Sequence, residues 1–158
     1  MHYLPTAEHA RTLTTEQLRA HFLLRDLFQP GALVLRPVDL DRALRIKNNA
    51  MRGGVLEHIY MRDVQVGQVA DAVLSVDLYY EEGQKGPYVP VIRDVEMRNV
   101  TSRKSKYAIY ARAYEKSEIS DVRVIDCRFD GVAQGSVTEG VRGLVLTGTT
   151  VNGRPASA

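Results

Sequence analysis

The chain has 158 residues, a net charge of +2 from 21 basic and 19 acidic residues, and a single cysteine, Cys127. This balance gives no electrostatic reason to expect a nucleic-acid or membrane partner, and one cysteine excludes an internal disulfide. The length fits one domain with at most a small appendage. Because no signal-peptide pattern and no apolar run of bilayer length occur, we expect a cytoplasmic protein.

The N-terminal part is predicted to contain one helix and one short strand. Thr14 and Gln17 have the spacing of a capping box, and an apolar helix is predicted over 15–28, ended by Pro30 and Gly31. Its apolar residues cover more than one stripe, so the helix must be buried on more than one side. Residues 32–35 are predicted to form a strand, which Pro37 restricts to an edge or an end of a sheet.

A pattern of apolar residues occurs in four copies between residues 56 and 151, at offsets of three, two, three and two. The first copy comprises Leu56, Ile59, Met61, Val64 and Val66, and the others begin at Ile92, Ile119 and Val141. Repeats of this length are typical of solenoids, in which each coil buries its apolar side chains against the next. The third copy contains Cys127 at an inward position, which favours a buried structural thiol.

Polar residues occupy one bend of each copy and are similar in kind: Asp63, Asn99, Asp126 and, last, Gly148. In a stack of coils, we expect these residues to lie above one another and their side chains to form a hydrogen-bonded ladder. Further strands are predicted between the copies, in 71–80, 107–111 and 136–138, and a long polar loop in 81–90. Short strands joined by tight turns predict an all-β fold, a right-handed parallel β-helix of about four coils.

Residues 45–55 read Arg-Ile-Lys-Asn-Asn-Ala-Met-Arg-Gly-Gly-Val. This segment resembles the Arg-Ile-Lys motif of polygalacturonase-type glycoside hydrolases and the Gly-Gly-Val entry to the strand that follows it. The repeats after it are similar to the last coils of that family, whose fold is a pectin-lyase-like solenoid. The resemblance covers residues 44–152 and implies carbohydrate chemistry for this part of the chain.

A second resemblance covers residues 1–42. Thr12 to Arg19, then Phe22-Leu23, Leu27-Phe28, Pro30-Gly31 and Asp41-Arg42, are similar to the beginning of the ketol-isomerases that act on 5-keto-4-deoxyuronate. We therefore predict two segments, an isomerase-like one at 1–43 and a polygalacturonase-like β-helix at 44–158. Both families act on pectin-derived uronates, which suggests the hypothesis that the chain joins the start of one reading frame to the end of another.

The polygalacturonase resemblance implies an inverting hydrolysis by two carboxyl groups. The family carries these acids in Asn-Thr-Asp and Asp-Asp motifs, near a Gly-His-Gly, and none of these motifs occurs here. Asp39 and Asp41 precede the Arg-Ile-Lys strand but do not reproduce the pair, so we expect solvated carboxylates and assign no catalytic residue.

The residues predicted to bind substrate are Arg45, Lys47 and Tyr80. Arg45 and Lys47 alternate along one strand and so share a face, where a guanidinium and an ammonium could hold the carboxylate of a galacturonate unit. Tyr80 stands where the family places a tyrosine beside the same subsite, with Tyr79 as a near competitor. The alternative is a solvated basic strand without a ligand.

No metal site and no cofactor are predicted. The isomerase family is of the cupin type and needs several converging histidines, whereas His2, His9, His21 and His58 are scattered along this sequence. We expect His58 to be a surface residue. The basic run around Lys104 and Lys106, which adjoins several tyrosines, is predicted to be a solvated bend, with a sugar-facing patch as the alternative use of the tyrosines.

The leading hypothesis is a truncated pectinase-like β-helix that binds uronates or oligogalacturonides and lacks the catalytic aspartates. Two alternatives stay open: a residual pectin-catabolic enzyme, with polygalacturonase or 5-keto-4-deoxyuronate isomerase activity, and a non-catalytic structural or interaction solenoid. The first coil of a shortened solenoid exposes an apolar end and an unpaired strand edge. We expect the helix at 15–28 to cap this end, and a homo-oligomer through the first coil otherwise.

Overall fold

The computed structural model describes residues 33–35 and 40–157, so the helix predicted at 15–28 lies outside the described residues. The described part consists of strands, turns and bends, in agreement with the predicted all-β class. Within these same residues there is no helix of the length and apolarity needed to cross a membrane.

The strands form two sheets whose neighbours run parallel, apart from one antiparallel pair near the C-terminus. The smaller sheet has the order β10-β7-β5-β2, with β2 at Leu44–Lys47, β5 at Ala72–Asp77, β7 at Tyr107–Arg112 and β10 at Val137–Glu139. The larger sheet contains β1 (Leu33–Leu35), β3 (Gly54–Leu56), β4 (Ile59–Val66), β6 (Pro90–Ser102), β8 (Glu118–Ile125), β9 (Arg128–Phe129), β11 (Val141–Arg142), β12 (Val145–Thr147), β13 (Thr150–Val151) and β14 (Arg154–Pro155).

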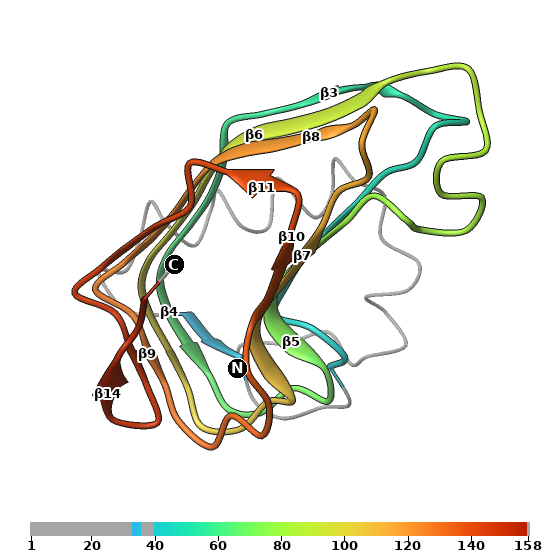
Figure 1. Ribbon diagram of the computed structural model, residues 1–158. Helices are drawn as coiled ribbons and strands as arrows, with labels where there is room; N and C mark the ends of the chain where they lie inside the picture. The colour runs from blue at the N-terminus through green and yellow to red at the C-terminus, as the bar shows by residue number, and fades with distance from the viewer. Residues whose placement is uncertain (1–32, 36–39, 158) are drawn as a thin grey trace, which may run out of the picture. The chain divides into compact units, whose positions relative to one another are not determined.

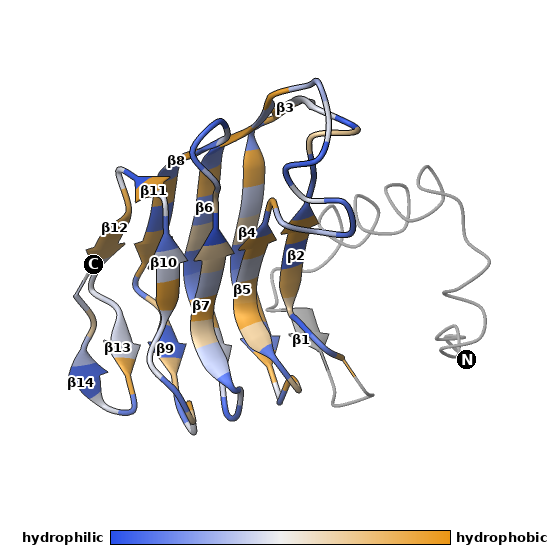
Figure 2. Cartoon of the chain, turned by 45° about the vertical axis from the view of Figure 1, so that its right-hand side comes forward, coloured by the Kyte–Doolittle hydropathy of each residue, from blue (hydrophilic) through white to orange (hydrophobic). Residues whose placement is uncertain are grey.

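The chain passes alternately between these sheets, and each pass lies beside the previous one. Strands β2, β5, β7 and β10 therefore appear side by side, with β4, β6 and β8 behind them in the same succession (Figure 2). Viewed nearly along the stack, the successive passes overlie one another around a common interior (Figure 1). The strands predicted in 71–80, 107–111 and 136–138 are thereby confirmed as β5, β7 and β10.

The register of the larger sheet follows the repeat seen in the sequence. Leu56 pairs with Ile92, Ile92 with Ile119, and Ile119 with Val141, which are the first positions of the four copies. The third positions also align, with Met97 between Met61 and Val124. Most of these side chains are fully buried in the central coils, where each large aliphatic contributes roughly 1.5–3 kcal/mol of hydrophobic stabilisation.

Left-handed residues make the bends within each copy. Asp63, Asn99, Asp126 and Gly148 have φ between 51° and 60°, a region that asparagine, aspartate and glycine adopt at the lowest cost. The Asn99 amide donates to Asp63 Oδ1 at 2.6 Å, which confirms the predicted ladder for this pair. A second row of such residues, not predicted, consists of His58, Asp94, Asp121 and Gly143.

Strand β1 lies at the end of the larger sheet, as Pro37 indicated for this segment. Leu33–Leu35 pairs in parallel with residues 64–66 of β4. A backbone segment from the isomerase-like part of the sequence therefore covers part of the edge of the first coil. The remaining surface of that coil includes Met51, Val55, Leu56 and Tyr60, which are exposed.

Candidate functional site

Arg45 and Lys47 project from the outer face of β2, on either side of the buried Ile46. The alternation of a strand produces this arrangement, because successive side chains point to opposite faces. The predicted common face of Arg45 and Lys47 is thus confirmed, whereas their role in binding stays a prediction.

Tyr80 meets both of these cations, although 33 residues separate it from Lys47. The chain turns outward after Leu78 at the end of β5, the neighbour of β2 in the sheet, and places the Tyr80 ring 3.8 Å from Lys47 Nζ. The guanidinium carbons of Arg45 and Arg52 each lie 5.5 Å from the centroid of the same ring. We call these four residues, Arg45, Lys47, Arg52 and Tyr80, the basic-aromatic surface.

The charges of this surface are only partly neutralised. Arg52 forms an ion pair with Glu81 at 2.8 Å, but no carboxylate of the described residues forms an ion pair with Arg45 or Lys47. Asp77 is paired with Lys47 in the strand register, yet its Oδ1 accepts the N–H of Tyr79 at 3.0 Å. Two cations beside a half-buried aromatic ring favour a ligand that carries both a carboxylate and an apolar face.

Two buried asparagines after β2 hold Tyr80 in place. Asn49 donates to the Tyr80 carbonyl at 3.1 Å and to Glu82 Oε2 at 2.8 Å, while its own oxygen accepts the N–H groups of Met51 and Arg52 at 3.1 Å. Asn48 supports this turn through its hydrogen bond to the Gly53 carbonyl, 2.8 Å long. The backbone turn after Arg-Ile-Lys and the loop after Tyr80 are therefore connected, which sequence reasoning did not predict.

Tyr79, the competitor of Tyr80, belongs to a neighbouring cluster. Its ring lies 4.5 Å from the guanidinium carbon of Arg112 and packs edge-on against Tyr114, with centroids 5.5 Å apart. Hydrogen bonds to Glu139 and then to Tyr110 raise the pKa of Arg112, so its charge is permanent and already paired. Position therefore favours Tyr80 over Tyr79 as the partner of Arg45 and Lys47.

The larger sheet carries a different arrangement of charges, centred on Glu96 in β6. Arg62 Nε lies 2.8 Å and Arg98 Nε 3.2 Å from Glu96 Oε1, while Arg123 Nε lies 3.6 Å from Oε2. The hydrogen bonds from Arg98 and Arg62 lower the pKa of Glu96 from 4.5 to about 2. Nearby, hydrogen bonds from Tyr60, Arg123 and His58 lower the pKa of Asp94. The two carboxylates are hydrogen-bonded to the surrounding side chains, which indicates a structural role for Glu96 and Asp94.

The lowered pKa of Glu96 predicts a loss of stability in acid. Because the folded-state pKa lies below the unfolded value, the stabilisation is complete above pH 4.5 and disappears as the pH falls towards about 2. Thermal unfolding across this range should show the difference in melting temperature between the wild type and Glu96→Gln shrinking as the pH falls. A difference that stays constant with pH would contradict this assignment.

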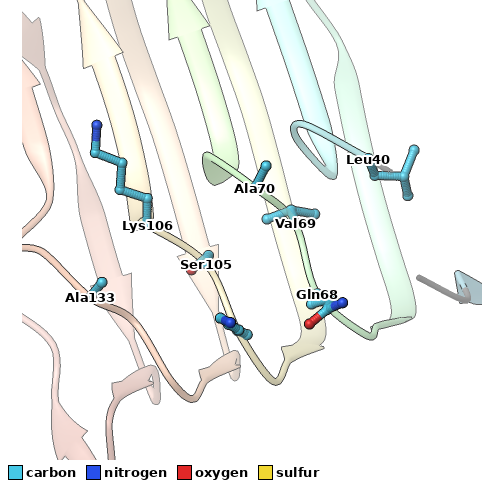
Figure 3. Close-up of a pocket in the computed structure, with 8 residues that line it drawn as sticks. Leu40, Gln68, Val69, Ala70, Ser105, Lys106 and Ala133 are labelled. Carbon is cyan, nitrogen blue, oxygen red and sulfur yellow. The ribbon is translucent and has the colours of Figure 1, made fainter. Parts of the chain in front are cut away.

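The basic run 103–106 connects β6 with β7, and Arg103, Lys104 and Lys106 are exposed, as expected for a solvated bend. Figure 3 shows Lys106 and the buried Ser105 at a hollow of about 500 Å³, together with Leu40 and Ala133. This hollow follows the turns that lead into β2, β5, β7 and β10, whereas Tyr80 lies beyond the opposite ends of the strands.

The remaining sequence predictions concern residues outside this surface. Asp39 lies outside the described residues, and Asp41 is exposed. His58 is also exposed, and its Nδ1 lies 2.6 Å from Asp94 Oδ2. No cluster of three potential metal-ligating side chains occurs in the described part of the chain. Cys127 is buried, and this burial raises the pKa of its thiol, in agreement with a structural role.

Comparison with a solved structure identifies the fold. The described coils resemble the crystal structure of a hyperthermoactive exopolygalacturonase from Thermotoga maritima, with a TM-score of 0.63 and 28% sequence identity. The fold is polygalacturonase-like. The match covers 70% of this chain but 25% of the exopolygalacturonase, so the chain spans about a quarter of that enzyme's length.

Comparison with sequences supports the second resemblance. Over 44 residues, 28% of this chain, the sequence is 48% identical to the 4-deoxy-L-threo-5-hexosulose-uronate ketol-isomerase of Opitutus terrae. The matched part is 16% of that enzyme. No family model matches the chain. Both resemblances drawn from the sequence are thus confirmed, each to a short part of a longer enzyme.

Proposed function

We propose that this chain is a right-handed parallel β-helix of the polygalacturonase type that binds uronates or oligogalacturonides through Arg45, Lys47 and Tyr80. It acts as a binding protein rather than a hydrolase, because the Asn-Thr-Asp and Asp-Asp motifs of the family do not occur in its sequence. The similarity to an exopolygalacturonase supports a pectin-derived ligand.

One observation carries this proposal: the ammonium of Lys47 and the guanidinium of Arg45 lie on one tyrosine ring, and neither forms an ion pair with a described carboxylate. A galacturonate unit matches this chemistry, since its carboxylate can accept charge-assisted hydrogen bonds from both cations. Each charge-assisted hydrogen bond contributes about 1.5–3 kcal/mol where water is excluded.

Calorimetric titration with galacturonate and trigalacturonate tests this function. The wild type should bind, and Arg45→Ala/Lys47→Ala should bind at least about tenfold more weakly, because each lost contact is worth more than about 1.4 kcal/mol. The double variant Lys104→Ala/Lys106→Ala, which removes the same charge elsewhere, is the matched control. Equal affinities for the two double variants would contradict binding through Arg45 and Lys47. No binding by the wild type would favour the non-catalytic structural or interaction solenoid.

Product analysis in the same samples separates binding from catalysis. We expect trigalacturonate to remain intact and 5-keto-4-deoxyuronate not to be isomerised. Release of mono- or digalacturonate, or formation of the ketol isomer, would instead support a residual pectin-catabolic enzyme.

We further propose that the helix predicted at 15–28 covers the first coil. The exposed Met51, Val55 and Tyr60 of that coil offer it an apolar surface. Phe22→Asp should then lower the melting temperature, or convert a monomer into a homo-oligomer through the open coil, as measured by size exclusion with light scattering. A monomer whose stability is unaffected by this change would contradict the proposal.

A further inference from the structure

Arg52 differs from the other two cations of the basic-aromatic surface, because it has a carboxylate partner among the described residues. Its Nη2 lies 2.8 Å from Glu81 Oε2, whereas Arg45 and Lys47 form no ion pair with a described carboxylate. The guanidinium carbon of Arg52 nevertheless lies 5.5 Å from the centroid of the Tyr80 ring, as does that of Arg45. Three cationic side chains thus lie near one ring, and a carboxylate of the protein itself occupies one of them.

The ion pair between Arg52 and Glu81 is open to solvent. The side chain of Arg52 is 53% exposed and that of Glu81 is 44% exposed. Exposed pairs stabilise a protein little, because water and salt screen the charges and because two long side chains lose conformational freedom. A ligand carboxylate can therefore replace the Glu81 carboxylate on the guanidinium without a large loss of folding stability.

The backbone around both partners is held independently of their ion pair. The Arg52 N–H donates to Asn49 Oδ1 at 3.1 Å. Asn49 Nδ2 donates to the Tyr80 carbonyl at 3.1 Å and to Glu82 Oε2 at 2.8 Å, so the residues before and after Glu81 are both anchored. Glu81 lies between these anchors with a φ of 54°, which is uncommon for a glutamate. Exchanging the partner of Arg52 therefore requires movement of side chains only.

Accepting the function proposed above, we propose that Arg52 is a further uronate-binding residue and that Glu81 is its partner only in the ligand-free protein. On binding, the Arg52 guanidinium exchanges the Glu81 carboxylate for the uronate carboxylate that Arg45 and Lys47 also hold. A carboxylate accepts several hydrogen bonds, and arginine can donate two parallel ones to it. Because Glu81 competes with the ligand for Arg52, the wild-type affinity is lower than the three cations alone would give.

A double-mutant cycle between Arg52 and Glu81 tests this inference, by calorimetric titration of the whole chain with galacturonate. Glu81→Gln nearly preserves the shape of the side chain and removes the competing charge, so it should raise the affinity about two- to fivefold, the range of an exposed ion pair. Arg52→Gln should lower the affinity of the wild type, and that of Glu81→Gln by at least about tenfold, because the full contact is then lost. Once Arg52 is replaced, Glu81→Gln should have no specific effect.

Glu115→Gln is the charge-matched control, because Glu115 is exposed and forms no ion pair with a described cation. In the Arg52→Gln background, the gain from Glu81→Gln should not exceed the gain from this control. An unchanged affinity in Glu81→Gln, or an equal gain with and without Arg52, would overturn the exchange while leaving binding through Arg45 and Lys47 intact. Absence of galacturonate binding by the wild type would overturn both proposals.

Discussion

Replacing Asn49 by alanine is expected to lower the free energy of unfolding by about 2–4 kcal/mol, because several partly buried hydrogen-bonding groups lose their partner at once. Asn49 is fully buried and joins the turn after β2 to the Tyr80 carbonyl and Glu82. Alanine leaves the N–H groups of Met51 and Arg52 and the Tyr80 carbonyl without these contacts. Urea denaturation monitored by circular dichroism measures the loss.

The same substitution should also weaken uronate binding, because Tyr80 is then no longer held beneath Lys47. Asn49→Asp separates the two effects: it keeps the acceptor for Met51 and Arg52, removes the donor to Tyr80 and places a carboxylate beside Glu82. Gln84→Ala, an exposed change in the same loop, is the control and should stay within about 0.5 kcal/mol of wild type. If Asn49→Ala proves as stable as Gln84→Ala, the loop does not depend on this side chain.

Truncation of Phe129 to alanine is expected to be the most destabilising change in the stack, at about 3–5 kcal/mol. Phe129 is fully buried and pairs in register with Ser102 of one coil and Val151 of the next. Neighbouring coils cannot close around the vacated space without breaking the register of their strands. Urea denaturation again gives the free energy of unfolding.

Val145→Ala provides the comparison for Phe129, since the Val145 side chain is 46% exposed and lies in the same part of the stack. Its removal should change the free energy of unfolding by less than about 0.5 kcal/mol. A small effect at Phe129, similar to that at Val145, would mean that the last coils contribute little to the cooperative unit.

The coil register could be predicted from the sequence because the inward side chains of every coil obey the same constraint. Leu56, Ile92, Ile119 and Val141 were aligned by spacing alone, and the structure pairs them in that order. A slip by one residue would turn each apolar side chain outwards, so burial fixes the register. The second row of left-handed bends, at Asp94 and Asp121, was not predicted, although its spacing is equally regular.

The candidate site was predictable from strand alternation and from the family resemblance, and only in part. Alternation alone gives Arg45 and Lys47 a common face, and the family resemblance brought in Tyr80. The contributions of Asn49 and Arg52 and the arginines around Glu96 depend on where turns, loops and strands of different coils meet. No spacing rule for a single strand contains that information.

The sequence by itself therefore determined that this chain forms stacked coils, because the spacing of apolar and polar residues is a local property that each coil repeats. The polygalacturonase-like character was implied by the resemblance of the Arg-Ile-Lys segment and the repeats that follow it. Only the tertiary structure decided that Lys47 and Arg45 meet the ring of Tyr80 rather than that of Tyr79. The physical reason is that stacking brings residues from different coils within contact distance. Hydrogen bonds such as those from the Asn49 amide to Tyr80 and Glu82 then fix the conformation of the loop, which the sequence alone does not determine.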